Sequence, residues 1–276
     1  MRHVNEAENA EEHQKDLERI ANFRLMDDDF MTAVFQGDTG CTELLLRIIM
    51  DKPLLHVQRV ITQDTIKNLQ GRSVRLDIHA YDEEGEYDIE VQRADKGAGR
   101  RRARYNGSII DANGLLSGEE CENLPEVYII FITEHDVLNG NLPIYHIERT
   151  IQENAAVFDD GMHIVYVNGG DTGNTPLGRL MHDFHCTDPD EMHYKTLADR
   201  VRYLKEDQEG VTAMCKAMEE MRKEAAAKAA AKARIESKIE DAIEMMKDHF
   251  SIDRIAKITK LSVEQITEAG RLQGLL

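Results

Sequence analysis

The stretch that decides the fold is RLDIHAYDEEGEYDIEVQRADKGAGRRRARY, residues 75–105, in which a carboxylate-rich segment runs directly into a dense run of arginines. Within and around it, residues 73–81 and 86–93 alternate apolar and polar side chains. Alternation with a period of two is typical of β-strands. The sequence therefore predicts a hairpin whose four-residue turn, 82–85, owes its flexibility to Gly85.

The register of this hairpin places two carboxylates face to face. Pairing Ile78 with Ile89 on the apolar face puts Asp77 opposite Glu90 on the polar face. Directly opposed like charges destabilise a sheet unless a cation lies between them. Mg²⁺ takes oxygen ligands, often one or two carboxylates together with water and substrate phosphate. A metal held there can polarise a phosphodiester and activate water for attack. The pair therefore predicts a metal site.

A basic run follows this carboxylate pair at once. Cations in this position can bind the backbone phosphates of the polyanion that the metal must reach. The candidate DNA-binding residues are Lys96, Arg100, Arg101, Arg102 and Arg104. An alternative stays open from periodicity alone, in which the carboxylates are solvated on a half-exposed strand face and the arginines balance nearby acid on a helix surface.

The overall composition limits the partners and the location of the chain. A formal net charge of −18 argues against nucleic-acid binding over the whole surface, but it leaves room for a local basic site. No apolar run approaches the ~18 residues of a membrane span, and the polar N-terminal segment does not resemble a secretory signal. Four scattered cysteines without a CxxC pair indicate a reduced, cytoplasmic protein.

The segments around the hairpin alternate between helical and strand patterns. Residues 27–52 predict two helices that are separated at Gly37 and Gly40. Strands are expected at 56–63 and 125–133, with shorter candidates at 143–149 and 162–169. Helices mixed with strands in this order indicate an α/β or α+β domain.

The chain beyond residue 175 reads as mostly helical. An Ala-rich stretch, EAAAKAAAKA, predicts an exposed spacer helix or a dimer helix. Near the end, Ser262 and Gln265 have capping-box spacing and open the second helix of a short helix-turn-helix shape. Because that helix offers only Arg271 as a cation, DNA recognition by it is not expected. The predicted regions are 1–25, a polar lead-in; 26–175, the core; 176–250, a helical extension; and 251–276, the terminal module.

One cluster of metal-ligating residue types lies apart from the hairpin. It contains His182, Asp183, His185, Cys186, Asp188, Asp190 and His193. The residue types suit zinc, but their spacing fits no standard zinc pattern. We favour a helix that ends near residue 186 and a second helix start capped by Thr187 or Asp188.

The hairpin and its surroundings resemble a known family. Leu76 and Asp77, followed after twelve residues by Glu90, Val91 and Gln92, are similar to the PD-(D/E)XK nuclease signature. The wider pattern resembles the PD-(D/E)XK nuclease family transposases, the recombination-promoting nuclease group. The similarity extends to LMDDDFMTAVFQ, PEVYIIFITEHDV, LPIYHIER, HIVYVNG and LMHDFHCTDPDEMHYKTLADRVRYLKE, so that it covers roughly residues 24 to 220.

This resemblance implies a restriction-endonuclease-like core, a mixed central sheet flanked by helices, and cleavage of DNA with Mg²⁺ or Mn²⁺. Asp77 and Glu90 match the metal-binding carboxylates. Gln92 stands where the signature most often has Lys, and a neutral amide cannot supply the positive charge of that Lys. Glu43, in the segment CTELLLRII, matches the acidic residue that many members carry on the first core helix, or else it is an ordinary exposed glutamate.

Three functions are therefore weighed. The first is a Mg²⁺-dependent DNA endonuclease associated with recombination or mobile elements. The second is a catalytically silent nucleic-acid-binding or regulatory protein, favoured if Asp77 and Glu90 point apart or a basic side chain fills their site. The third is an oligomeric scaffold in which the Ala-rich helix and the terminal helical hairpin dominate. A homodimer through the C-terminal helices is a separate expectation, since paired cuts across a duplex favour a dimer.

Overall fold

The computed structural model describes residues 2–68 and 71–276, and it divides the chain after Cys215 into two compact units. The helices of the first unit are α1 (Arg2–Asn22), α2 (Asp28–Phe35), α3 (Thr39–Ile49), α4 (Arg100–Gly114), α5 (Pro176–His185) and α6 (Lys195–Glu206), with short 3₁₀ turns η1 (Asp95–Gly97), η2 (Cys121–Asn123) and η3 (Pro189–Glu191). The long helix α7 (Gln208–Lys247) begins in this unit.

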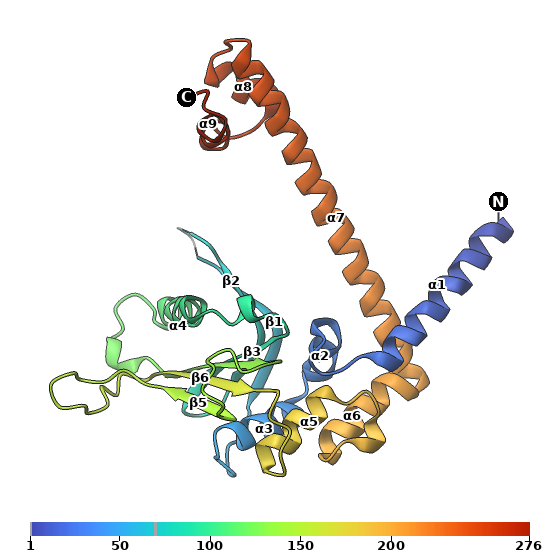
Figure 1. The fold of residues 1–276 in the computed structure, drawn as a ribbon, viewed down its shortest axis with the longest axis vertical. Coiled ribbons are helices and arrows are strands. Elements are labelled where there is room, and N and C mark those ends of the chain that lie inside the picture. Colours follow the sequence, from blue (N-terminus) through green and yellow to red (C-terminus); the bar gives the residue numbers. More distant parts are fainter. Residues whose placement is uncertain (1, 69–70) are drawn as a thin grey trace. The chain divides into compact units, whose positions relative to one another are not determined.

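A six-stranded mixed sheet forms the centre of the first unit (Figure 1). Its strands are β1 (Arg59–Ile66), β2 (Val74–Tyr81), β3 (Gly85–Gln92), β4 (Glu126–Thr133), β5 (Ile144–Ile147) and β6 (Met162–Asn168). The order is β1-β2-β3-β4-β6-β5; β3, β4 and β6 run parallel, and the other neighbours are antiparallel. The predicted α/β class with a mixed sheet is confirmed.

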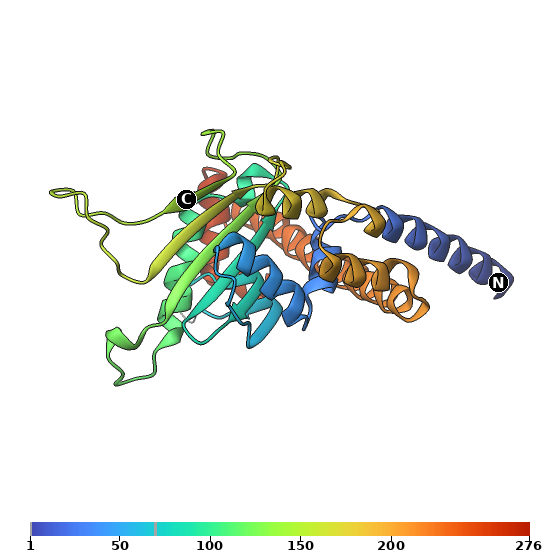
Figure 2. The same ribbon diagram turned by 90° about the horizontal axis from the view of Figure 1, so that it is seen from below.

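Helices cover both faces of this sheet (Figures 1 and 2). The face that carries Asp88 and Glu90 also carries their parallel partners Ile129 and Phe131 on β4, and α4 packs over it. On the opposite face, the ammonium of Lys52, just after α3, lies 5.3 Å from the ring centre of Tyr128. The polar face of the hairpin is therefore an interior surface beneath α4.

Burial of this polar face excludes the alternative in which the carboxylates are solvated on a half-exposed strand surface. Asp77 is 8% exposed, and Asp88 and Glu90 are fully buried. Their apolar neighbours Ile78 and Ile89, on the other face, are also fully buried. A carboxylate loses much of its hydration when it is buried, so simple solvation cannot explain these acids.

The hairpin turn was predicted to need Gly85 for its flexibility, but the structure shows a different reason for the glycine. Gly85 opens β3, and a Cβ built on it would lie 2.6 Å from the backbone oxygen of Glu126. The glycine is needed because β4 approaches closely, whereas the turn itself is held by Asp82, whose Oδ1 accepts hydrogen bonds from the amides of Glu84 and Gly85. The first strand also begins three residues later than predicted, at Arg59.

The second unit, residues 216–276, contains the rest of α7, α8 (Ile252–Thr259) and α9 (Val263–Leu272). A small core of its own includes Met246, Ile255 and Ile266. The predicted capping box is present: Ser262 Oγ accepts from the amide of Gln265, and Gln265 Oε1 accepts from the amide of Ser262. Among the described residues of the whole chain, no helix has the length and apolar character of a membrane span.

Candidate active site

Asp77 lies where strand pairing is interrupted on both sides. Toward β3, the pairing recorded for β2 ends at Ile78 and Ile89, and the amide of Val91 donates to Asp77 Oδ2 at 3.2 Å. Toward β1, the register is the same on both sides of Gln63, but no pair joins Gln63 to Asp77, and the φ of Gln63 is +54°, a left-handed conformation. A residue in this conformation costs free energy and persists only where the surrounding structure enforces it. Such residues are concentrated at functional sites. The interruption lets the Asp77 carboxylate face a cavity.

Gln92 joins the two signature carboxylates. Its Nε2 donates to Asp77 Oδ2 at 3.2 Å and to Glu90 Oε2 at 3.1 Å. The side chain fits because Gly97 has no Cβ; a Cβ there would lie 1.8 Å from Gln92 Oε1. Asp77 and Glu90 therefore converge on one point, and the neutral amide occupies the place of the signature Lys.

The first turns of α4 supply polar partners from above the sheet. The guanidinium of Arg102 forms an ion pair with Glu90 Oε2, and its Nη1 donates to the carbonyl of Gly97 at 3.1 Å. Asn106 Nδ2 donates to Asp88 Oδ2 at 2.8 Å and to Glu90 Oε1 at 3.1 Å. A basic side chain thus touches the site, as the silent-protein alternative requires, while the carboxylates still converge, as the nuclease requires.

Burial and mutual repulsion make the three carboxylates hard to ionise together. Burial raises the pKa of Asp88 to about 7, and burial together with the charges of Asp88 and Asp77 raises the pKa of Glu90 to about 9. Burial also raises the pKa of Asp77, despite the nearby charge of Arg102. Among the residues that the structure describes, Asp88 Oδ1 has no hydrogen-bond partner, although it is buried. Three buried carboxylates and an orphaned oxygen fit a divalent cation, because oxygen atoms are the ligands that hard ions prefer.

A fourth carboxylate reaches the site from α2. After burial, the charge of Asp28 is the largest influence that raises the pKa of Asp77. Gln63 Nε2, on β1, donates to Asp28 Oδ1 at 3.2 Å. Sequence reasoning did not select Asp28, although an acidic residue that opens an apolar helix was a visible signal.

Glu43 has a different environment. Its carboxylate lies 2.7 Å from the guanidinium of Arg47 and 2.7 Å from His56 Nδ1, and it accepts a hydrogen bond from the amide of Val57. These contacts tie α3 to the segment before β1. The structure therefore brings Asp77, Glu90 and Gln92 together and gives Glu43 a structural set of partners instead.

A second polar network adjoins the carboxylates. His79 is the cross-strand partner of Asp88, and its ring nitrogens lie 2.8 Å from Asp64 Oδ2 and 3.1 Å from Glu86 Oε2. Burial lowers the pKa of His79, but the bonds to Glu86 and Asp64 raise it overall. The resulting positive charge lowers the pKa of Asp88. His79 therefore acts on the site through Asp88.

Asp77 lines a basic cavity of about 920 Å³, and Asp88 and Glu90 are buried behind it. Six cations line it as well: Arg72, Arg75, Lys96, Arg101, Arg102 and Arg104. Four of the five cations selected from the sequence thus lie around one cavity with Asp77, and Arg100 is not among its lining residues. Arg72 and Arg75 were missed, because they precede the basic run on the other side of the hairpin.

Comparisons with known proteins identify the family of the chain. Searches of the curated proteins and of the solved structures gave no match. A family model described as PD-(D/E)XK nuclease family transposase matches residues 43–260, which is most of the chain. This family implies a restriction-endonuclease-like fold, which the six-stranded mixed sheet between helices agrees with, and a nuclease or transposase-related function. The chain belongs to the PD-(D/E)XK nuclease family transposases.

Proposed function

We propose that this chain is a metal-dependent DNA endonuclease. The observation that carries the proposal is the convergence of Asp77 and Glu90 on Gln92, together with the position of Asp77 in the lining of a cavity that six cations share. Buried acids beside a basic cavity suit a substrate that is a polyanion and a cofactor that is a cation. Recombination or mobile elements are the setting that the family description suggests, and the cytoplasm remains our expected location.

Asp77 and Glu90 would hold the ion, with Asp88 beside them through its orphaned Oδ1. Mg²⁺, or Mn²⁺ in its place, would polarise the scissile phosphate and lower the pKa of a bound water. Asn106 holds the carboxylates of Asp88 and Glu90 in fixed orientations by donating to both. Asp28 adds negative charge on the α2 side of Asp77.

Arg102 and Gln92 together replace the Lys that the signature most often has at position 92: one supplies its charge and the other its positioning of the carboxylates. Gln92 positions the two carboxylates but carries no charge. Arg102 brings a permanent positive charge to Glu90, next to the place where negative charge develops on the phosphate. The remaining cations of the cavity, Lys96, Arg101 and Arg104 among them, would bind flanking phosphates.

Cleavage of supercoiled plasmid DNA in Mg²⁺ or Mn²⁺, beside EDTA and an Asp77→Ala variant, tests the proposal. Nicking that requires the metal and disappears in the variant supports it. Arg102→Gln should slow cleavage by about 10²-fold, because it removes a charge from the reacting centre. Arg104→Gln, the matched change at a cavity arginine, should mainly weaken binding and reduce its salt dependence by about one phosphate contact.

The ion pair between Arg102 and Glu90 also favours a second candidate, a silent DNA-binding protein. In that case Arg102 permanently takes the place of the metal. DNA binding that persists without any cleavage in Mg²⁺ or Mn²⁺, and cleavage that stays absent in Arg102→Gln, would select this candidate over the nuclease.

A further inference from the structure

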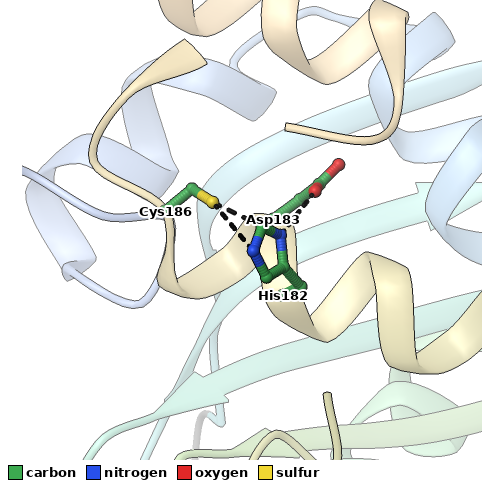
Figure 3. A group of neighbouring side chains, drawn as sticks. All are labelled: His182, Asp183 and Cys186. Atoms are coloured by element: carbon green, nitrogen blue, oxygen red, sulfur yellow. Dashed lines mark hydrogen bonds and ion pairs between the residues drawn. The ribbon is translucent and has the colours of Figure 1, made fainter. Parts of the chain in front are cut away.

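A second group of metal-ligating side chains lies at the end of α5, apart from the carboxylate site (Figure 3). One donor atom each from His182, Asp183 and Cys186 lies within 4.8 Å of the others. Cys186 Sγ is 3.4 Å from His182 Nδ1, and that nitrogen is 3.4 Å from Asp183 Oδ1. These separations resemble those of donors that share one tetrahedral ion, since bonds of about 2.0 to 2.3 Å place neighbouring donors roughly 3.5 Å apart.

The fold brings a further imidazole to this group. The ring of His193, in the segment before α6, lies 4.6 Å from the ring of His182, centre to centre. Asp183 fixes that segment, because its Oδ1 accepts from the amide of His193 and its Oδ2 from the amide of Tyr194, both at 2.8 Å. Asp183 is fully buried, so this anchor is rigid. The spacing along the sequence does not by itself show that His193 lies next to His182 in the fold.

The other members of the cluster seen in the sequence have different partners. His185 Nε2 bonds to the carbonyl of Gly169 at 3.1 Å. The Asp188 side chain accepts from the amide of Asp190 and begins η3, and the Asp190 carboxylate pairs with Arg202. The structure thus reduces a loose set of seven residues to a compact set of four.

We propose that Cys186, His182 and Asp183 bind a divalent ion of the zinc class, with His193 at the remaining position. Sulfur and imidazole ligands select zinc over Mg²⁺, so this site is distinct from the carboxylate site in chemistry as well as in place. A carboxylate oxygen has two lone pairs, so Asp183 Oδ1 can keep its bond from the backbone and still contact the ion. Binding converts the Cys186 thiol to thiolate and releases its proton to solvent.

The ion would fasten the end of α5 to the start of α6. These helices pack against α2 and α3, and Phe184 of α5 lies 6.3 Å from Phe35 of α2, ring centre to ring centre. A cross-link here would stabilise the helical layer that presents α2 to the sheet. Its role is structural, and it does not depend on the proposed nuclease activity.

Titration of the untagged, chelator-treated full chain with Co²⁺ tests the site. Tetrahedral Co²⁺ bound through a thiolate gives a sulfur-to-metal charge-transfer absorption, which we expect to saturate at about one equivalent. Zn²⁺ should displace the Co²⁺ and raise the melting temperature, and Mg²⁺ should do neither. Cys186→Ser should abolish the charge-transfer band. His182→Gln should weaken binding by at least about 10-fold, the usual effect of losing even an outer partner of a metal site.

Two matched variants serve as controls: Cys121→Ser, at an exposed cysteine in η2, and Asp77→Ala, in the carboxylate site. Both should keep the band. The proposal is overturned by the absence of a saturable charge-transfer band, even if Co²⁺ binds elsewhere, or by a charge-transfer band that survives Cys186→Ser. If far-UV circular dichroism shows that Cys186→Ser is unfolded, His182→Gln decides, because its side chain is 38% exposed and tolerates change; unchanged Co²⁺ affinity in that variant also overturns the proposal.

Discussion

At the scale of single residues, the titration of Asp88 makes the folding stability of the protein depend on pH. It is fully buried, its Oδ1 has no hydrogen-bond partner within the described part of the chain, and its pKa is raised to about 7. A group whose folded-state pKa is raised binds its proton more tightly in the folded protein than in the unfolded chain. Stability therefore decreases as pH rises from about 4, the pKa of an unfolded aspartate, to about 7. Glu90 extends the decrease to about pH 9.

The first prediction concerns this charge. In EDTA, Asp88→Asn should melt at a higher temperature than the wild type at pH 8 and should show a flatter dependence between pH 5 and 8, because one buried charge is removed. Each kcal/mol gained should raise the melting temperature by about 2–4 °C. Asp241→Asn, an exposed change on α7, should leave the pH dependence as it is. Equal pH slopes in Asp88→Asn and wild type would contradict this account of the site.

The second prediction tests whether Asp28 or Glu43 is the helix carboxylate that contributes to the active site. Asp28→Asn should reduce the rate of metal-dependent DNA cleavage, because the charge of Asp28 acts on Asp77. Glu43→Gln should cleave at close to the wild-type rate and lose some thermal stability, because it gives up an ion pair with Arg47. Single-turnover cleavage rates and melting temperatures, measured for both variants, distinguish Asp28 from Glu43. The reverse ranking of the two rates would restore Glu43 to the site.

Residue roles were predictable where they followed from local periodicity. Alternation along the hairpin placed Asp77, Glu90 and Gln92 on one face, and the structure joins their side chains. The same alternation contained Asp88, but a strand pattern alone does not show that α4 will bury that face. Asp28 lies far from Asp77 in the chain, and only helix packing on the sheet brings the two together.

At the scale of elements, the segment between β3 and α4 sets the position of Gln92. Gly97 lies against the Gln92 side chain, and the Gly97 carbonyl accepts a hydrogen bond from Arg102. The third prediction is that Gly97→Ala displaces the Gln92 amide from both carboxylates and lowers the cleavage rate while the protein stays folded. Gly99→Ala is the matched control, since the nearest atom to its added Cβ is 4.0 Å away. Cleavage rates, with circular dichroism to confirm folding, test the pair; loss of activity in Gly99→Ala alone would refute the role of Gly97.

Most elements were predictable because their hydrophobic periods are clear. The predicted strands 73–81, 86–93 and 125–133 agree closely with β2, β3 and β4. The first strand is displaced toward the C-terminus because it pairs along the whole length of β2, a tertiary effect that its own sequence does not encode. The basic segment becomes a helix that covers the acids, so that its charges meet theirs in the interior.

At the scale of the whole molecule, the division after Cys215 leaves a terminal unit with its own small core. A hollow of about 320 Å³ in that unit is lined by residues that include Ile239, Ile243 and Leu272, and Leu272 is 80% exposed. Paired cuts across a duplex need two active sites, which a two-fold dimer supplies. The homodimer through the C-terminal helices therefore stays our prediction, as does the four-part division of the chain.

The fourth prediction tests this dimer. The full chain should sediment as a dimer, and Leu272→Glu should shift it toward the monomer, because a charge in an apolar contact loses hydration without gaining a partner. Lys257→Glu, at an exposed position of α8 that does not line this hollow, should leave the sedimentation coefficient unchanged. A full chain that sediments as a monomer at micromolar concentration would remove the C-terminal helices from the assembly.

The central claim is that the buried carboxylates, gathered beneath a basic helix, hold a metal that cleaves DNA. The most direct measurement compares single-turnover DNA cleavage in Mg²⁺ by the wild type and by Asp77→Asn, with DNA affinity measured on the same samples. The account predicts cleavage by the wild type, a loss of at least about 10²-fold in the variant, and DNA binding that is retained or stronger. Equal cleavage rates in the two proteins would contradict it.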